Sequence, residues 1–117
     1  MQIALNKFLK ELKSLSPGAF SQIENLFPLE FNIEVSSVSK FSISLNHDEQ
    51  TFNFFKHPNP SFSFKLSIYN VLNALNNKQI PTKSISGDVE NALILLGAIA
   101  NIDIDVELLV YKYFGDI

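Results

Sequence analysis

Four short stretches between residues 31 and 66 decide the fold of this 117-residue chain. Each alternates apolar with polar side chains, and they read FNIEV (31–35), KFSISL (40–45), TFNF (51–54) and SFSFKL (61–66). A period of two places the apolar side chains on one face of a strand and the polar ones on the other. The turn-like segments NHDE and HPNP separate the later stretches. The pattern predicts a four-stranded antiparallel meander over residues 30–66, covered on one face only.

Helical spacing precedes these strands. Apolar residues recur three and four positions apart from Leu5 to Leu15, which is typical of one face of a helix. Ser16 and Pro17 are placed as the N-cap and first residue of a second helix, and Pro28 ends it. Residues 1–28 are therefore predicted to form an N-terminal helical pair.

Residues 67–117 are predicted to run helix, strand, helix, helix. Ser67 is placed to cap the first of these helices, residues 83–86 fit a short strand, and Asp88 is placed to cap the second helix. Asp103 or Asp105 is placed to cap the last. The whole chain is thus predicted to be a single α+β domain, a five-stranded, mainly antiparallel sheet with helices packed on one face.

Composition narrows the function classes. The net charge is −3, all nine basic residues are Lys, and the chain has neither Arg nor Cys. A general nucleic-acid binder would show a basic patch, so we expect no nucleic-acid partner. No apolar run reaches the roughly 20 residues that span a bilayer. Lys7, Lys10 and Lys13 lie where a signal peptide would be apolar, so we expect a cytoplasmic protein.

The sequence offers no catalytic or metal-binding set. His47 and His57 lie in two different turns, without the spacing of a helical metal pair. Asp103 and Asp105 are explained by helix capping, and Gly87 stands alone instead of in a phosphate-binding loop. We therefore expect a protein that is not an enzyme and needs no cofactor or metal.

Two surfaces of the predicted fold can each be interpreted in two ways. The helix after Gly87 is apolar over most of its circumference, so it is either buried on two sides or turned toward a ligand or partner. The lysines at positions 7, 10 and 13 form either a solvated helix face or a weak dock for an anionic membrane surface. If these lysines form such a dock, the protein would also contact a membrane peripherally.

Residues 62–96 resemble the sterol carrier protein type 2 domain, with a strand, a Ser-capped helix, a short strand and a Gly-Asp pair that opens the next helix. More specifically, the chain resembles the bacterial ubiquinone biosynthesis accessory factor J family. The matching motifs are LSPGAF (15–20), ISGDVE (85–90), NIDIDVELL (101–109) and FGDI (114–117). Their order and spacing match over essentially the whole chain.

This resemblance implies a five-stranded sheet with helices on one face and an apolar cavity between them. It implies binding of polyprenylated quinone precursors and their presentation to soluble ubiquinone biosynthesis enzymes, peripheral to the inner membrane. In the family a helical extension pairs with accessory factor K; the printed sequence ends at Ile117. The residues expected to line the cavity and bind lipid are Leu72, Leu75, Leu93, Leu96, Ile99, Leu109 and Phe114.

Two other functions fit the same pattern. One is a generic fatty-acid or sterol-type lipid carrier, which would differ in the lipid class that co-purifies. The other is a lipid-free scaffold that binds proteins through its apolar helices. A fully packed core without a cavity would favour the scaffold.

Overall fold

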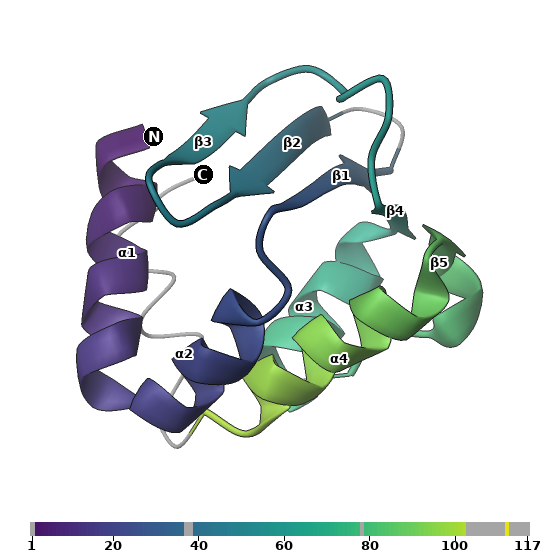
Figure 1. The fold of residues 1–117 in the computed structure, drawn as a ribbon. Coiled ribbons are helices and arrows are strands. Elements are labelled where there is room, and N and C mark those ends of the chain that lie inside the picture. The colour runs from purple at the N-terminus through teal and green to yellow at the C-terminus, as the bar shows by residue number, and fades with distance from the viewer. Residues whose placement is uncertain (1, 37–38, 78, 103–111, 113–117) are drawn as a thin grey trace.

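The computed structural model describes residues 2–36, 39–77, 79–102 and 112, and within them it is an α+β fold (Figure 1). The helices are α1 (Gln2–Leu15), α2 (Pro17–Glu24), α3 (Ile68–Asn77) and α4 (Val89–Ala100), with a 3-10 turn η1 (Thr82–Ser84) before the last strand. The strands are β1 (Leu29–Val35), β2 (Ser39–Leu45), β3 (Gln50–Asn53), β4 (Phe62–Leu66) and β5 (Ile85–Gly87). The helix predicted after Asp103 lies outside the described residues.

Three of the four predicted caps lie on described residues, and two of these three form as hydrogen bonds. The Ser67 hydroxyl accepts from the backbone N–H of Asn70 at 3.0 Å, and the Asn70 side chain accepts from the Ser67 N–H. The Asp88 carboxylate accepts from the backbone N–H of Asn91 at 3.0 Å. Ser16 is the N-cap of α2, as predicted, but its hydroxyl is buried and has no hydrogen-bond partner. Pro17 therefore sets the start of α2 by its backbone shape.

The sheet is mixed, with strand order β3-β2-β1-β4-β5. β1 pairs with β2, β2 with β3, and β4 with β5 in antiparallel fashion, whereas β1 pairs with β4 in parallel. The predicted meander over residues 30–66 therefore holds only from β1 to β3. The two-residue period fixes which face each side chain occupies but not which strands are neighbours, so it did not reveal the parallel pair.

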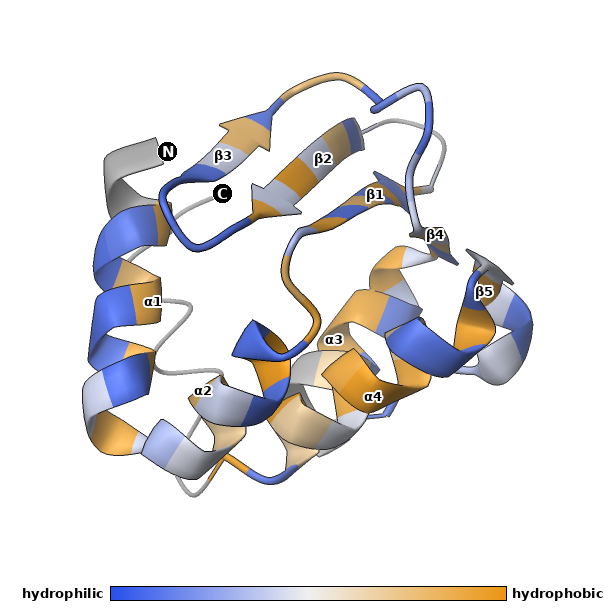
Figure 2. Cartoon of the chain, in the orientation of Figure 1, coloured by the Kyte–Doolittle hydropathy of each residue, from blue (hydrophilic) through white to orange (hydrophobic). Residues whose placement is uncertain are grey.

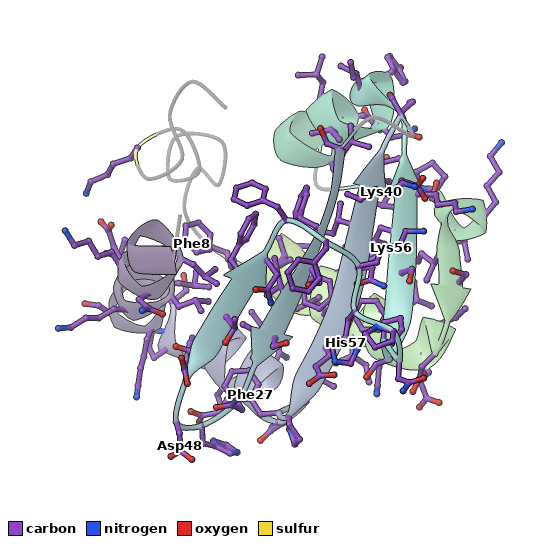
Figure 3. The ribbon with its side chains drawn as sticks, turned by 90° about the horizontal axis from the view of Figure 1, so that it is seen from above. Phe8, Phe27, Lys40, Asp48, Lys56 and His57 are labelled. Carbon is purple, nitrogen blue, oxygen red and sulfur yellow. The ribbon has the colours of Figure 1, made fainter. Side chains whose placement is uncertain are left out.

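The segment 54–61 crosses the polar face of the sheet to carry the chain from β3 to β4 (Figure 3). Eight residues can reach about 26 Å, whereas the three strand spacings to be crossed amount to about 14 Å. Asn32 of β1 holds this crossing segment by two hydrogen bonds. Its amide nitrogen donates to the carbonyl oxygen of His57 at 3.0 Å, and its amide oxygen accepts from the N–H of His57 at 2.8 Å.

Charged side chains add a second set of contacts on this face. Glu34 lies 3.8 Å from the ammonium of Lys40 and 3.6 Å from that of Lys56. The Nδ1 atom of His57 accepts from the N–H of Asn59, which leaves Nε2 to donate to Glu30 at 2.6 Å. The polar face expected to be uncovered is thus partly covered by the crossing segment, because its Asn and Glu residues bind that segment.

The apolar face of the sheet carries the core. α2, α3 and α4 lie on this side, and α1 lies beside the β3 edge (Figure 1). Phe31 and Phe62 occupy paired positions on the parallel strands, and their rings stack with centroids 5.1 Å apart. Phe64 meets both rings edge to face. These three buried rings close the middle of the apolar face.

Gly87 cannot be replaced without strain, and we expect Gly87→Ala to lower the free energy of unfolding by about 2 to 4 kcal/mol. Its φ is +92°, and an added Cβ would lie 2.8 Å from the carbonyl oxygen of Ser61. Gly97→Ala is the matched control, because a Cβ there meets nothing within 4 Å. A helical Ala should instead stabilise the protein by about 1 kcal/mol. Urea denaturation of both variants measures the difference, and equal effects would contradict this account.

The Asn32 contacts predict a second stability effect. Asn32→Asp keeps the shape of the side chain but replaces the donor to the His57 carbonyl by an oxygen that repels it. We expect a loss of about 1 to 3 kcal/mol in the free energy of unfolding. Asn59→Asp places the same charge at an exposed position of the crossing segment and should change stability by less than about 0.5 kcal/mol. Similar losses in both variants would show that charge, and not the Asn32 contacts, is responsible.

Candidate functional site

Helix α4 is apolar on its exposed face as well as on its buried face. Ala92, Leu95 and Ala98 are buried against the core, whereas Leu93 is 48% exposed and Ile94 is 42% exposed. Figure 2 shows hydrophobic residues along most of the helix. Of the two interpretations for this helix, burial on two sides is wrong. α4 turns an apolar surface toward solvent, which is typical of a face that meets a ligand or partner.

A groove of about 510 Å³ runs between α3 and α4 and is closed at one side by the turn before β5. The groove is open to solvent along its outer side. Its apolar lining comes from the turn and from α4, and Asn73 of α3 faces them. The lining residues are Asn73, Gln79, Ile80, Pro81, Thr82, Leu93, Leu96, Gly97 and Ala100. None of these side chains is charged or titratable.

The predicted lining residues fall into three groups. Leu93 and Leu96 line the α3/α4 groove. Leu72 lies on the exposed surface of α3, where 55% of its area is open to solvent, and Ile99 is half-buried and packs against the core. The remaining predictions fall outside the described part of the chain, namely the side chain of Leu75 together with residues Leu109 and Phe114.

Leu72 belongs to a larger exposed patch on α3. Ile68 is 63% exposed and Tyr69 is 75% exposed, one turn before it on the same helix. The sequence of α3, IYNVLNALNN, contains no charged residue. The outer face of α3 is therefore a second exposed apolar surface, on the same helix as Asn73 of the groove.

A second groove, of about 460 Å³, lies on the other side of α4, against α2. Three amide side chains surround an apolar floor there. The lining residues are Gln22, Asn25, Leu26, Ile94, Gly97, Ala98 and Asn101. Sequence reasoning missed this groove, because its two walls come from distant parts of the chain. Gly97, in the middle of a helix that is otherwise rich in Leu and Ile, is the one signal that could have drawn attention to it.

The remaining candidates have structural contacts. His47 meets the ring of Phe27 edge to face, and His57 contacts Glu30 and the crossing segment. Among the described residues, no group of three His, Asp or Glu side chains is arranged to hold a metal ion.

Helix α1 carries the lysines expected to face solvent or a membrane surface. Lys7, Lys10 and Lys13 are all exposed, and the ammonium of Lys13 lies 5.6 Å from the centre of the Phe20 ring. Glu11 on the same helix pairs with Lys112 at 3.1 Å. In the part of the chain that the structure describes, no helix combines the length and the apolar character needed to cross a bilayer.

Comparison with known proteins adds no assignment. Neither a protein-family model nor a curated protein matches this chain. The two grooves beside α4 and the sequence motifs that resemble the accessory factor family are the features of this chain that bear on its function.

The exposed face of α4 predicts a contrast between two neighbouring leucines. Leu93→Ala should lower the free energy of unfolding by less than about 1 kcal/mol, because half of the side chain is already in water. Leu95→Ala should cost about 2 to 4 kcal/mol, because Leu95 is only 4% exposed and its removal leaves a cavity. Chemical denaturation measures both values. A large cost at Leu93 would mean that this side chain serves the fold.

Proposed function

We propose that this chain is a non-catalytic lipid-binding accessory factor of ubiquinone biosynthesis. In this proposal the α3/α4 groove holds the polyprenyl tail of a quinone precursor and presents its ring to soluble enzymes. The observation that carries the proposal is the apolar α3/α4 groove bounded by the half-exposed Leu93. Leu72 and Ile68 extend the apolar surface beyond it.

The fold supports this proposal. An α+β domain with a five-stranded sheet and helices over its apolar face is the arrangement that a sterol carrier protein type 2-like domain implies. Partnership with accessory factor K and action in the cytoplasm, peripheral to the inner membrane, belong to the same proposal. The described residues that line the α3/α4 groove carry no titratable side chain, which supports a binding role over acid–base chemistry there.

The energetics suit a carrier that releases its cargo. Removing one five-carbon isoprene unit from water is worth roughly 4 kcal/mol, at about 0.8 kcal/mol per carbon. A bilayer solvates the same unit equally well, so transfer from bilayer to groove is close to neutral only for the part of the tail that the groove covers. An open groove that covers only part of the tail therefore favours exchange with a membrane or an enzyme over permanent storage.

One further observation favours a second candidate function. The exposed face of α3, with Ile68, Tyr69 and Leu72, is wide and carries no charge, as the centre of a protein interface does. A lipid-free scaffold would use this face to bind another protein. Such a scaffold would not need the groove between α3 and α4.

The test is lipid content and lipid response. The protein purified from its own source should yield a prenylated phenol or quinone on solvent extraction and mass spectrometry. A farnesyl-substituted phenol should raise the melting temperature, because a ligand that binds only the folded state stabilises it. The double variant Leu72→Ser, Leu93→Ser should bind the phenol at least about tenfold more weakly, since each half-covered leucine contributes about 1 kcal/mol.

Leu15→Ser is the matched control, because Leu15 is 52% exposed at the end of α1, away from the groove. It should bind the phenol like the unmodified protein. Absence of any extracted lipid, together with no thermal response to the phenol, would refute the lipid-binding proposal and leave the scaffold. Unchanged ubiquinone levels after deletion of the gene would remove the pathway.

A further inference from the structure

Gly97 joins the two grooves beside α4. It lines the α3/α4 groove on one side and the α2/α4 groove on the other. A Cβ atom at this position would meet nothing within 4 Å, so the packing of the fold does not require glycine here. Gly87 is the contrast, since a close backbone approach excludes any side chain there. An exposed glycine in a helix weakens the helix but opens the space above its backbone.

The two grooves differ in chemistry. The α3/α4 groove is lined mainly by aliphatic side chains, whereas the α2/α4 groove places Gln22, Asn25 and Asn101 around an apolar floor. Within the described residues these three amide side chains make no hydrogen bond, so their donors and acceptors are available to a ligand. The apolar groove and the amide-lined groove meet at Gly97, so together they match the apolar tail and the polar head of an amphiphile.

The charges around the two grooves limit which chemical groups the polar end of the ligand can carry. Among the described residues no charged side chain lines either groove, and the chain has no Arg. Asn25 is the C-cap of α2 and Asn101 is the C-cap of α4, so both helices direct their C-terminal ends at the α2/α4 groove. Helix C-termini carry partial negative charge, which disfavours a carboxylate or phosphate and favours a hydrogen-bond donor or a cation. A charged group of either sign bound there would lose water, and the described lining offers no opposite charge to pair with it, so an uncharged donor is favoured over an ammonium as well.

We propose that the two grooves form one site for a prenylated amphiphile whose head is an uncharged hydrogen-bonding ring, such as a phenol or hydroquinone. The tail lies in the α3/α4 groove, the chain crosses α4 above Gly97, and the ring contacts Gln22, Asn25 and Asn101. Amide side chains both donate and accept, so they can bind a phenolic O–H and a ring carbonyl alike. This inference rests on the proposed lipid-binding function and adds that the site selects by the charge of the head.

Four probes with the same tail test this selection on the unmodified protein: a farnesyl-substituted phenol, farnesoic acid, farnesylamine and the hydrocarbon farnesene. Competition against a fluorescent lipid probe gives their affinities. The phenol should bind about tenfold more tightly than farnesene and than farnesoic acid at pH 7, and the amine should not exceed the phenol. Equal affinity for phenol and farnesene would overturn the head site, and tightest binding of the acid or amine would overturn its neutral character.

Variants then locate the head. Gln22→Leu and Asn101→Leu remove amides at nearly constant size and should each lower the phenol-to-farnesene affinity ratio several-fold. Gly97→Leu should lower the same ratio by closing the crossing point, whereas Gly18→Leu, at another glycine with open space, should not. If farnesene binds and the ratio is unchanged in all three, the head site is wrong and the tail groove stands. If no probe binds the unmodified protein, the proposed function itself fails.

Discussion

The hydrogen bonds between Asn32 and the backbone of His57 hold a non-local connection on which the positions of β4 and of the helices after it depend. They hold the segment from β3 across the sheet, so that β4 forms a parallel pair with β1. Ser61, at the end of this segment, donates to the carbonyl oxygen of Glu30 and accepts from the N–H of Asp88. The start of α4 is therefore linked to the centre of the sheet through a single residue. Because α3 leaves β4 and α4 leaves β5, the position of both grooves follows from this crossing.

Much of this arrangement is local and could be predicted from the sequence. The alternation in residues 31–66 identifies the strands and their apolar face, and the Ser67 and Asp88 caps mark two helix starts correctly. The parallel pair could not be predicted, because alternation describes faces and says nothing of strand order. Asn32 lies at a polar position of the alternation, where a solvent-facing residue is expected, yet it is only 5% exposed beneath the crossing segment. Burial of such a residue depends on a contact 25 positions away.

The candidate site likewise has features that the sequence predicts and features that it does not. The apolar circumference of α4 left open a surface for a ligand or partner, and Leu93 and Leu96 line a groove between α3 and α4. Ile99 packs against the core, as Leu96 does, but it is not among the residues that line this groove. Helical periodicity could not separate them, because it does not tell which apolar side of such a helix faces inward. The amide groove escaped prediction because Asn25 and Asn101 end different helices and meet only in the folded chain. Isolated Asn residues at helix ends are common caps and carry no functional signal by themselves.

The proposed site also has a physical consequence for the length of its ligand. A closed cavity limits a prenyl tail to the carbon atoms that fill it, whereas the α3/α4 groove is open to solvent along its outer side. Units beyond the groove would extend over the apolar surface formed by Ile68 and Leu72, or remain in a membrane. Binding free energy then stops increasing once the groove is covered, because additional units are solvated equally well in the bilayer. Selection among ligands must therefore come from the head, where the amides and the two helix C-termini act, and not from the tail.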